Sequence, residues 1–115
     1  MTQKDMELLI KDIFEEVQDM RDAGQKEYAQ QEDNAFANFE RIGGWLKKDK
    51  KEVLMIYLMK HIDGICSWIN GHKSQREDVT GRITDCIVYL CLLYGMSQGK
   101  EHKPPNYQTI GDNVI

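Results

Sequence analysis

The chain lacks paired cysteine motifs and an excess of positive charge, and both absences argue against whole classes of protein. Its three cysteines, Cys66, Cys86 and Cys91, lie in apolar runs and lack the paired two-residue spacing that zinc sites use. We therefore expect reduced core cysteines in a cytoplasmic protein. The formal net charge of -4 argues against a general nucleic-acid or anionic-membrane binder, because such affinity depends on clustered Lys and Arg.

Long apolar segments and familiar catalytic motifs are missing as well. Acids interrupt the first apolar residues, so we expect no signal peptide, and no run approaches the length of a membrane span. The sequence contains no GxxxxGK[ST], GxGxxG, HExxH or GxSxG motif. These absences leave metal-assisted chemistry or no catalysis at all.

The chain is rich in helical periodicity. Its 115 residues, 41% of them hydrophobic, suit one domain with a modest core. Apolar spacings of three and four predict helices from Asp5 to about Ala23, Asn34 to about Lys48, Lys50 to Asn70 and Glu77 to about Ser97. We predict an all-α bundle of four main helices over residues 1–98. Residues 99–115, which include Pro104 and Pro105, are predicted to form an extended or adaptable C-terminal tail.

Capping residues support these helices. Thr2 or Asp5 can cap the first helix, Glu32 or Asp33 the second and Asp49 the third, and Gly71 can end the third. The first helical pattern can run on past Gly24 to Tyr28. The third helix is apolar around nearly its whole circumference, which predicts a central position and a homo-oligomer. In the fourth helix we expect these residues to be buried: Val79, Ile83, Cys86, Ile87, Leu90, Cys91 and Tyr94.

The segment from Lys26 to Leu46 carries the most informative pattern, KEYAQQEDNAFANFERIGGWL. It places three polar residues on one helical face and three aromatic residues on another: Asn34, Asn38 and Arg41, and Phe36, Phe39 and Trp45. A polar triplet beside aromatic rings suits a planar, anionic ligand. An ordinary amphipathic helix has the same pattern.

Charged residues also interrupt the two most apolar helices, where burial without a partner is costly. Each helix has one polar edge: Lys60, His61, Asp63 and Ser67 on the third, and Asp78, Arg82, Asp85 and Tyr89 on the fourth. If the two edges face each other, they form a cleft for a phosphate or a metal-bridged nucleotide. The alternative is structural ion pairing of Lys60 with Asp85 or of Arg82 with Asp63.

Three smaller features have two interpretations each. Asp12, Glu16 and Asp19 can share a face of the first helix, either as oxygen ligands for Mg²⁺ or as a solvated acidic surface. His61 is either an acid or base or a hydrogen-bonded structural residue. The cluster of Lys47, Lys48, Lys50 and Lys51 is either a local basic site or a solvated helix end.

Three segments together resemble a known group: KEYAQQEDNAFANFERIGGWL, VLMIYLMKHIDGICSWINGH and EDVTGRITDCIVYLCLLYG. They are similar to small phage and prophage proteins related to the nucleotide modification associated domain, which lies near the MazG-like all-α NTP pyrophosphohydrolases. The similarity covers roughly Lys26 to Gly95. It depends on these residues: Tyr28, Asn38, Phe39, Lys60, His61, Arg82 and Asp85.

The resemblance implies an all-α fold, nucleotide recognition and, by analogy, Mg²⁺-dependent cleavage between the α- and β-phosphates. It predicts ligand-binding roles for Tyr28, Asn38, Phe39, Arg41, Lys60 and Arg82, catalytic roles for His61 and Asp85, and Mg²⁺ ligation by Glu16, Asp19 and Asp85. The MazG-like enzymes carry a Glu-x-x-Glu pair and a Glu-x-x-Asp pair. Here Arg82 stands where the second pair has its first carboxylate, and a guanidinium binds phosphate but repels Mg²⁺.

The sequence therefore predicts a phage-type nucleotide-binding protein of the host cytoplasm, with Mg²⁺-dependent pyrophosphohydrolase activity left open. One alternative is a non-catalytic anti-defence protein that sequesters a nucleotide-derived signal. Another is an anti-CRISPR-like inhibitor of a host nuclease, which uses the acidic surface for protein-protein contact. Neither alternative requires turnover.

Overall fold

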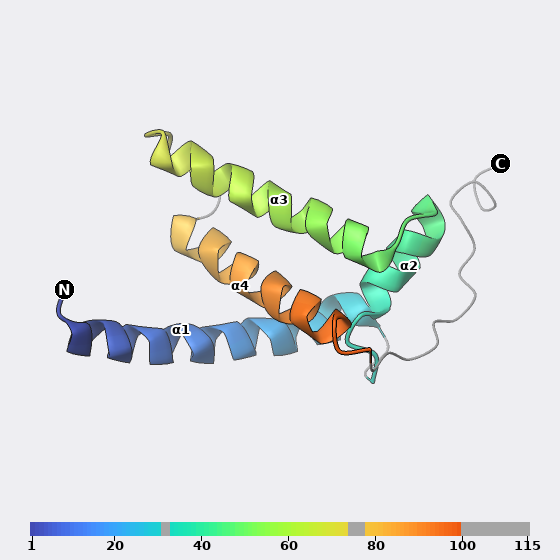
Figure 1. The fold of residues 1–115 in the computed structure, drawn as a ribbon, viewed down its shortest axis with the longest axis horizontal. Helices are drawn as coiled ribbons and strands as arrows, with labels where there is room; N and C mark the ends of the chain where they lie inside the picture. The colour runs from blue at the N-terminus through green and yellow to red at the C-terminus, as the bar shows by residue number, and fades with distance from the viewer. Residues whose placement is uncertain (31–32, 74–77, 100–115) are drawn as a thin grey trace.

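The structure is a computed structural model that describes residues 1–30, 33–73 and 78–99, and it is all-α (Figure 1). Its elements are α1 (Gln3–Gly24), the π-helix η1 (Gln25–Ala29), α2 (Ala37–Leu46), α3 (Lys50–Ile69) and α4 (Val79–Met96). The predicted all-α fold with four main helices is confirmed. The predicted tail lies outside the described residues, apart from Gly99.

Side-chain caps begin three of the helices: Thr2 and Asp49 are caps that the sequence predicts, whereas Asp78 was predicted to lie inside a helix that begins at Glu77. Thr2 Oγ1 accepts the Asp5 N–H at 3.1 Å while Asp5 accepts the Thr2 N–H at 3.0 Å, a reciprocal capping box. Asp49 accepts the Lys51 N–H at 2.8 Å, and Asp78 accepts the Val79 N–H at 2.9 Å. These ends follow from local chemistry alone.

The second helix begins three residues later than predicted. Its N-cap is Phe36, which makes no capping side-chain bond. Asn34, predicted as the first helical residue, instead accepts the Phe36 N–H on its own side-chain oxygen at 3.0 Å. This side-chain turn competes with the helix for the same backbone donor. Asp33 does not cap α2, and Glu32 lies outside the described residues.

The first helix does continue past Gly24, as a π-helical turn. η1 ends at Ala29, and its C-cap Gln30 has a φ of 65°, in the left-handed region. π-turns of this kind often occur at functional sites, because the extra residue changes the direction of the side chains that follow. Here the turn carries Glu27 and Tyr28.

α4, rather than α3, holds the central position. α4 lies between α3 and α1 and packs against both of them (Figure 1). α3 lies on one side of α4 and packs against α4 and α2. The outer face of α3 is exposed and includes Met59 and Ile62. The prediction of a central α3 is therefore wrong, because a helix that is apolar on all sides gives no sign of which side meets its neighbours.

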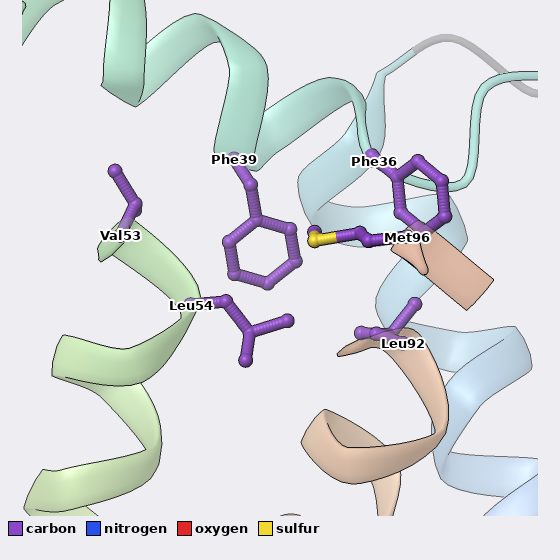
Figure 2. Packing of buried hydrophobic residues seen from close by; sticks show 6 residues of the cluster. All are labelled: Phe36, Phe39, Val53, Leu54, Leu92 and Met96. Atoms are coloured by element: carbon purple, nitrogen blue, oxygen red, sulfur yellow. The ribbon is translucent and has the colours of Figure 1, made fainter. Parts of the chain in front are cut away.

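The core lies where α2, α3 and α4 meet (Figure 2). It consists of Phe36, Phe39, Val53, Leu54, Leu92 and Met96. Figure 2 shows Phe39 of α2 pointing into the space between Val53 and Leu54 of α3 and Met96 of α4. Gly95 brings α4 close to Phe36, since a Cβ there would lie 3.2 Å from the Phe36 ring. The core therefore fixes α2, and with it Asn38 and Arg41.

The buried face of α4 differs from the predicted one. Cys86 is buried and Val79 and Ile87 are half-buried, but Ile83, Leu90, Cys91 and Tyr94 are exposed. Thr84, Leu92 and Met96 are buried in their place. Cys66 is exposed too, so the expectation of core cysteines is right only for Cys86, although all three thiols are free. The reason is that α1 and α3 cover α4 from two sides and leave a third apolar side uncovered.

The expectation that no run approaches a membrane span needs correction. By length and composition α4 is apolar enough to cross a membrane, with a mean hydropathy of 1.3 over 18 residues, 22% of them buried. Core helices of globular proteins meet the same test. α4 carries Arg82 and Asp85 and packs between two other helices.

Candidate functional site

A cavity of about 430 Å³ opens where α1 and η1 meet α2, α3 and α4. Its lining combines aromatic rings, cations, two carboxylates and amides. The polar and aromatic lining residues are Arg21, Glu27, Tyr28, Gln30, Asn38, Phe39, Arg41, Tyr57, Lys60, His61, Asp85 and Tyr89. Such a mixture of apolar surface with a few polar groups is typical of small-molecule sites.

Three aromatic rings from three helices form one wall of the cavity. The Phe39 centroid lies 5.9 Å from that of Tyr57 and 6.3 Å from that of Tyr89, and Tyr57 lies 6.3 Å from Tyr89. The His61 ring lies 5.6 Å from Tyr89, tilted by 34°. All the interplanar angles are oblique, which aromatic pairs prefer over face-to-face stacking. The wall therefore presents ring surface from three elements at once.

Arg41 ties α2 to the π-turn. Its Nη2 donates to the Tyr28 carbonyl at 3.0 Å, and its guanidinium carbon lies 5.9 Å from the Trp45 ring centroid. The Tyr28 side chain is exposed, and the negative charge of adjacent Glu27 raises the pKa of its phenol. The predicted ligand residues Tyr28 and Arg41 are thus held together by a direct bond.

Arg21 approaches the same region from α1. It donates to the side-chain oxygen of Gln25 and to the Ala35 carbonyl, the latter at 3.2 Å, and burial lowers the pKa of its guanidinium. Gln25 in turn donates to the Asn34 carbonyl at 3.1 Å. These bonds fasten the segment before α2 to the first helix.

A buried polar network fastens that segment to α2 and α3. Asn34 Nδ2 donates to Glu40 Oε2 at 2.9 Å, and Lys50 Nζ lies 3.6 Å from Glu40 Oε1. The side chains of Glu40 and Lys50 are only 4% and 12% exposed. Of the predicted lysine cluster, Lys47, Lys48 and Lys51 are exposed, in agreement with a solvated helix end, and Lys50 belongs to this network.

His61 and Asp85 meet across the α3–α4 interface. His61 Nδ1 is buried and lies 3.5 Å from Asp85 Oδ2, an ion-pair distance rather than that of a well-formed hydrogen bond. Burial, and then the charge of Asp85, raise the pKa of Tyr89 to about 12. Tyr89 is therefore a neutral hydrogen-bonding group at any physiological pH. His61 and Asp85 are thus a histidine and a carboxylate from two helices that approach each other in the cavity.

The cavity contains most of the residues that the sequence singled out. Tyr28, Asn38, Phe39, Arg41, Lys60, His61 and Asp85 all line it. Arg82 does not: its side chain lies so close to Gly64 that a Cβ there would have no room. Glu16 and Asp19, on an exposed part of α1, do not line the cavity either.

The predicted polar edges of the third and fourth helices meet only in part. Asp63 and Ser67 are exposed, and within the described ranges Lys60 does not pair with Asp85, nor Arg82 with Asp63. His61 is the α3 residue that reaches Asp85. Lys60 is the adjacent residue, so its side chain projects about 100° away around the helix axis. The same part of the chain holds no group of three or more His, Cys, Asp or Glu that could hold a metal ion. Glu16, Asp19 and Asp85 therefore do not come together.

Five of the polar and aromatic lining residues were not predicted as site residues: Arg21, Glu27, Gln30, Tyr57 and Tyr89. Tyr57 had a signal, since it lies three and four residues before Lys60 and His61 and so shares their helical face. Tyr89 follows Asp85 by one turn. Arg21 and Glu27 had none, because the π-turn that directs this region is not visible in the apolar periodicity.

Cys86 is the one buried thiol close to this region. Burial, and then the charge of Asp85, raise its pKa, which disfavours the reactive thiolate. Thiol chemistry therefore has no support here. The cavity offers ring surface, three cations, two carboxylates and a histidine.

Comparison with protein-family models, with curated proteins and with solved structures gives no match.

Proposed function

We propose that this protein binds a nucleotide, or a nucleotide-derived signal, in the cavity. The support lies in one observation: in an acidic chain, Arg21, Arg41 and Lys60 line the same cavity as three clustered aromatic rings. Arg and Lys bind phosphate oxygens through charge-assisted hydrogen bonds. Aromatic rings bind bases by stacking, and Asn38 adds donors and an acceptor for a base edge.

Mg²⁺-dependent pyrophosphohydrolysis is the second candidate, and one observation favours it. Asp85, Glu27 and His61 line the cavity together with the cations. Mg²⁺ usually takes one or two protein carboxylates and completes its shell with waters and substrate phosphates, so Asp85 and Glu27 fit that donor set. Bound in this way, the ion would neutralise phosphate charge. We place simple binding first, because the described residues lack the larger carboxylate cluster predicted from α1 and α4.

A nucleotide panel tests the proposal. The full chain is heated with nucleoside mono-, di- and triphosphates, modified nucleotides and cyclic nucleotides, with and without Mg²⁺, and its Tm is followed. A bound nucleotide raises the Tm in proportion to the logarithm of its concentration. Intact ligand recovered after denaturation indicates sequestration, and released pyrophosphate indicates hydrolysis, which Asp85→Asn should abolish. A panel with no stabilisation and no turnover would overturn the proposal in favour of a protein-interaction module.

Two lysines of α3 make a matched pair for locating the site. Lys60 lines the cavity, whereas Lys51, an exposed residue nine positions earlier on the same helix, does not. Lys60→Ala should weaken nucleotide binding roughly tenfold or more, because hydrogen bonds to charged groups contribute about 1.5–3 kcal/mol. Lys51→Ala should leave affinity unchanged in titration calorimetry. Equal effects of the two substitutions would place the ligand elsewhere.

A further inference from the structure

A carboxylate stands beside the aromatic wall of the cavity. Asp85 lies on α4 about one turn before Tyr89, which is one of the three clustered rings. Burial, and then the charge of Asp85, raise the pKa of Tyr89, so the carboxylate is close enough to act on the hydroxyl of that ring. His61 lies at the same corner, with Nδ1 3.5 Å from Asp85 Oδ2 and its ring 5.6 Å from Tyr89. A flat ligand that lies against the wall can therefore present one edge to Asp85.

Two of the three cations of the cavity are held on another side of it. Arg41 of α2 donates to the Tyr28 carbonyl at 3.0 Å, and Arg21 of α1 donates to the Ala35 carbonyl at 3.2 Å. These bonds keep both guanidinium groups beside η1 and the segment before α2, whereas Asp85 belongs to the α3–α4 interface. Phosphate is attracted to guanidinium groups and repelled by a carboxylate. A nucleotide with its phosphates towards the arginines thus turns its base towards Asp85.

A carboxylate distinguishes bases by the hydrogen-bond donors that they present. An ionised carboxylate only accepts hydrogen bonds, through two oxygens side by side. Guanine presents two adjacent donors, N1–H and the 2-amino group. Adenine and cytosine present an amino donor next to a ring-nitrogen acceptor, and uracil places one N–H between two carbonyl groups. Guanine is therefore the common base whose edge matches both oxygens, whereas the amide of Asn38, which donates and accepts, suits several bases.

The burial of Asp85 makes this distinction strong. Its side chain is 25% exposed, whereas Glu27, the other carboxylate that lines the cavity, belongs to an exposed residue. A base that turns an acceptor towards a buried carboxylate removes water from both groups without giving either of them a donor, which is costly. Water still reaches an exposed carboxylate, so the same mismatch costs less there. Asp85, rather than Glu27, is therefore suited to distinguish bases.

We propose that the nucleotide bound in this cavity carries guanine, and that Asp85 accepts hydrogen bonds from its N1–H and its 2-amino group. This inference rests on the proposed function in the form of binding, since it assigns Asp85 to the base and not to Mg²⁺. A carboxylate has about four lone-pair sites, so Asp85 can accept from guanine while its Oδ2 stays near His61.

A panel of nucleotides with equal numbers of phosphates tests the choice of base. GTP, ATP, CTP, UTP and ITP are each titrated into the full chain in a calorimeter, and the series is repeated with the mono- and diphosphates. The guanine nucleotide should bind about tenfold or more tightly than those of adenine, cytosine and uracil, because a bidentate contact distinguishes bases by roughly that factor. The inosine nucleotide, which lacks the 2-amino group, should bind with an affinity between those for guanine and adenine.

Asp85→Asn should change which base is preferred. The amide oxygen of Asn accepts from N1–H while its amino group donates, which matches xanthine, whose 2-carbonyl replaces the 2-amino group of guanine. The variant should therefore bind XTP more tightly than GTP, a gain that an unfolded or loosened protein cannot produce. Asp63→Asn is the matched control, because Asp63 is an exposed residue of α3 that does not line the cavity, and it should leave every affinity unchanged.

The possible contrary results separate the base from the proposed function. Binding of several nucleotides without a preference for guanine would overturn the choice of base and leave the proposed function standing. A guanine preference that Asp85→Asn leaves unchanged would overturn the role of Asp85. A panel in which no nucleotide binds would overturn both the proposed function and this inference.

Discussion

The ion pair between Glu40 and Lys50 leads to a quantitative prediction about the framework that holds the cavity. Lys50→Met keeps the length and apolar stem of the side chain but removes the ammonium group 3.6 Å from Glu40 Oε1. Glu40 remains 4% exposed, with Asn34 Nδ2 as its hydrogen-bond donor at 2.9 Å. Removing one partner of a buried pair costs about 3–5 kcal/mol, because it leaves the other charge buried and uncompensated.

We expect Lys50→Met to lose less than this, about 2–3 kcal/mol of unfolding free energy, for two reasons. The N···O distance is long for an ion pair, and the 12% exposure of Lys50 leaves water some access to the gap. The Lys50 ammonium also lies 5.7 Å from the Phe36 ring centroid, a cation–π contact that the variant loses.

Urea unfolding followed by circular dichroism measures the loss of unfolding free energy, and two further variants are measured beside Lys50→Met. Lys51→Met is the matched control: its side chain is 51% exposed and its ion pair with Asp49 spans 3.9 Å, so it should change stability by less than about 0.5 kcal/mol. Glu40→Gln combined with Lys50→Met should be more stable than Lys50→Met alone, because no charge stays buried. The reasoning fails if Lys50→Met behaves like its control or if the double variant is the least stable of the three.

Three further predictions concern backbone and titration. Gly43→Ala should lower stability by about 1–2 kcal/mol, because its Cβ would lie 2.6 Å from the Lys48 carbonyl oxygen. Gly24→Ala, with no neighbour closer than 4.0 Å, should raise stability by about 0.5–1 kcal/mol. Chemical denaturation that ranks the two variants in the reverse order would contradict this reasoning. Lys47→Gly should stabilise the protein by about 1 kcal/mol, since Lys47 caps α2 at a φ of 56°; an unchanged thermal midpoint would count against the strain argument. Tyr89 should ionise near pH 12 in an ultraviolet titration. Because its pKa in the folded protein exceeds the ordinary value of 10.0, the stability that Tyr89 contributes is complete below pH 10 and is lost as the pH rises to about 12. Tyr89→Phe should lose less stability over this alkaline range, and a pH profile identical to that of the unsubstituted protein would refute the prediction.

The helices and their ends were predictable from the sequence, because the causes are local. Apolar spacing shows that a segment is helical, and Thr2 and Asp49 cap helices with side chains two or three residues from the backbone groups they bind. Asp78 caps α4 by the same local chemistry, two residues after the predicted start at Glu77. Where one local effect opposes another, prediction is weaker. The Asn34 side chain takes the Phe36 N–H, and α2 begins only at Ala37.

Part of the candidate site was predictable for the same reason. Asn38, Phe39 and Arg41 are close in sequence, and a helix fixes their relative directions. Lys60, His61 and Asp85 stood out as charged residues in apolar helices. The π-turn that brings Glu27 and Tyr28 to the cavity comes from the fold, since apolar periodicity does not distinguish a π-turn from the end of an α-helix.

The sequence by itself determined that this chain is all-α, where most of its helices begin and which polar residues need an explanation. Only the tertiary structure decided which faces of α3 and α4 are buried, because helices that are apolar nearly all round orient by the shape of their neighbours. That choice brought His61 rather than Lys60 to Asp85, and turned Arg82 towards Gly64. It also left one apolar face of α3, with Met55, Met59, Ile62 and Ile69, exposed to water.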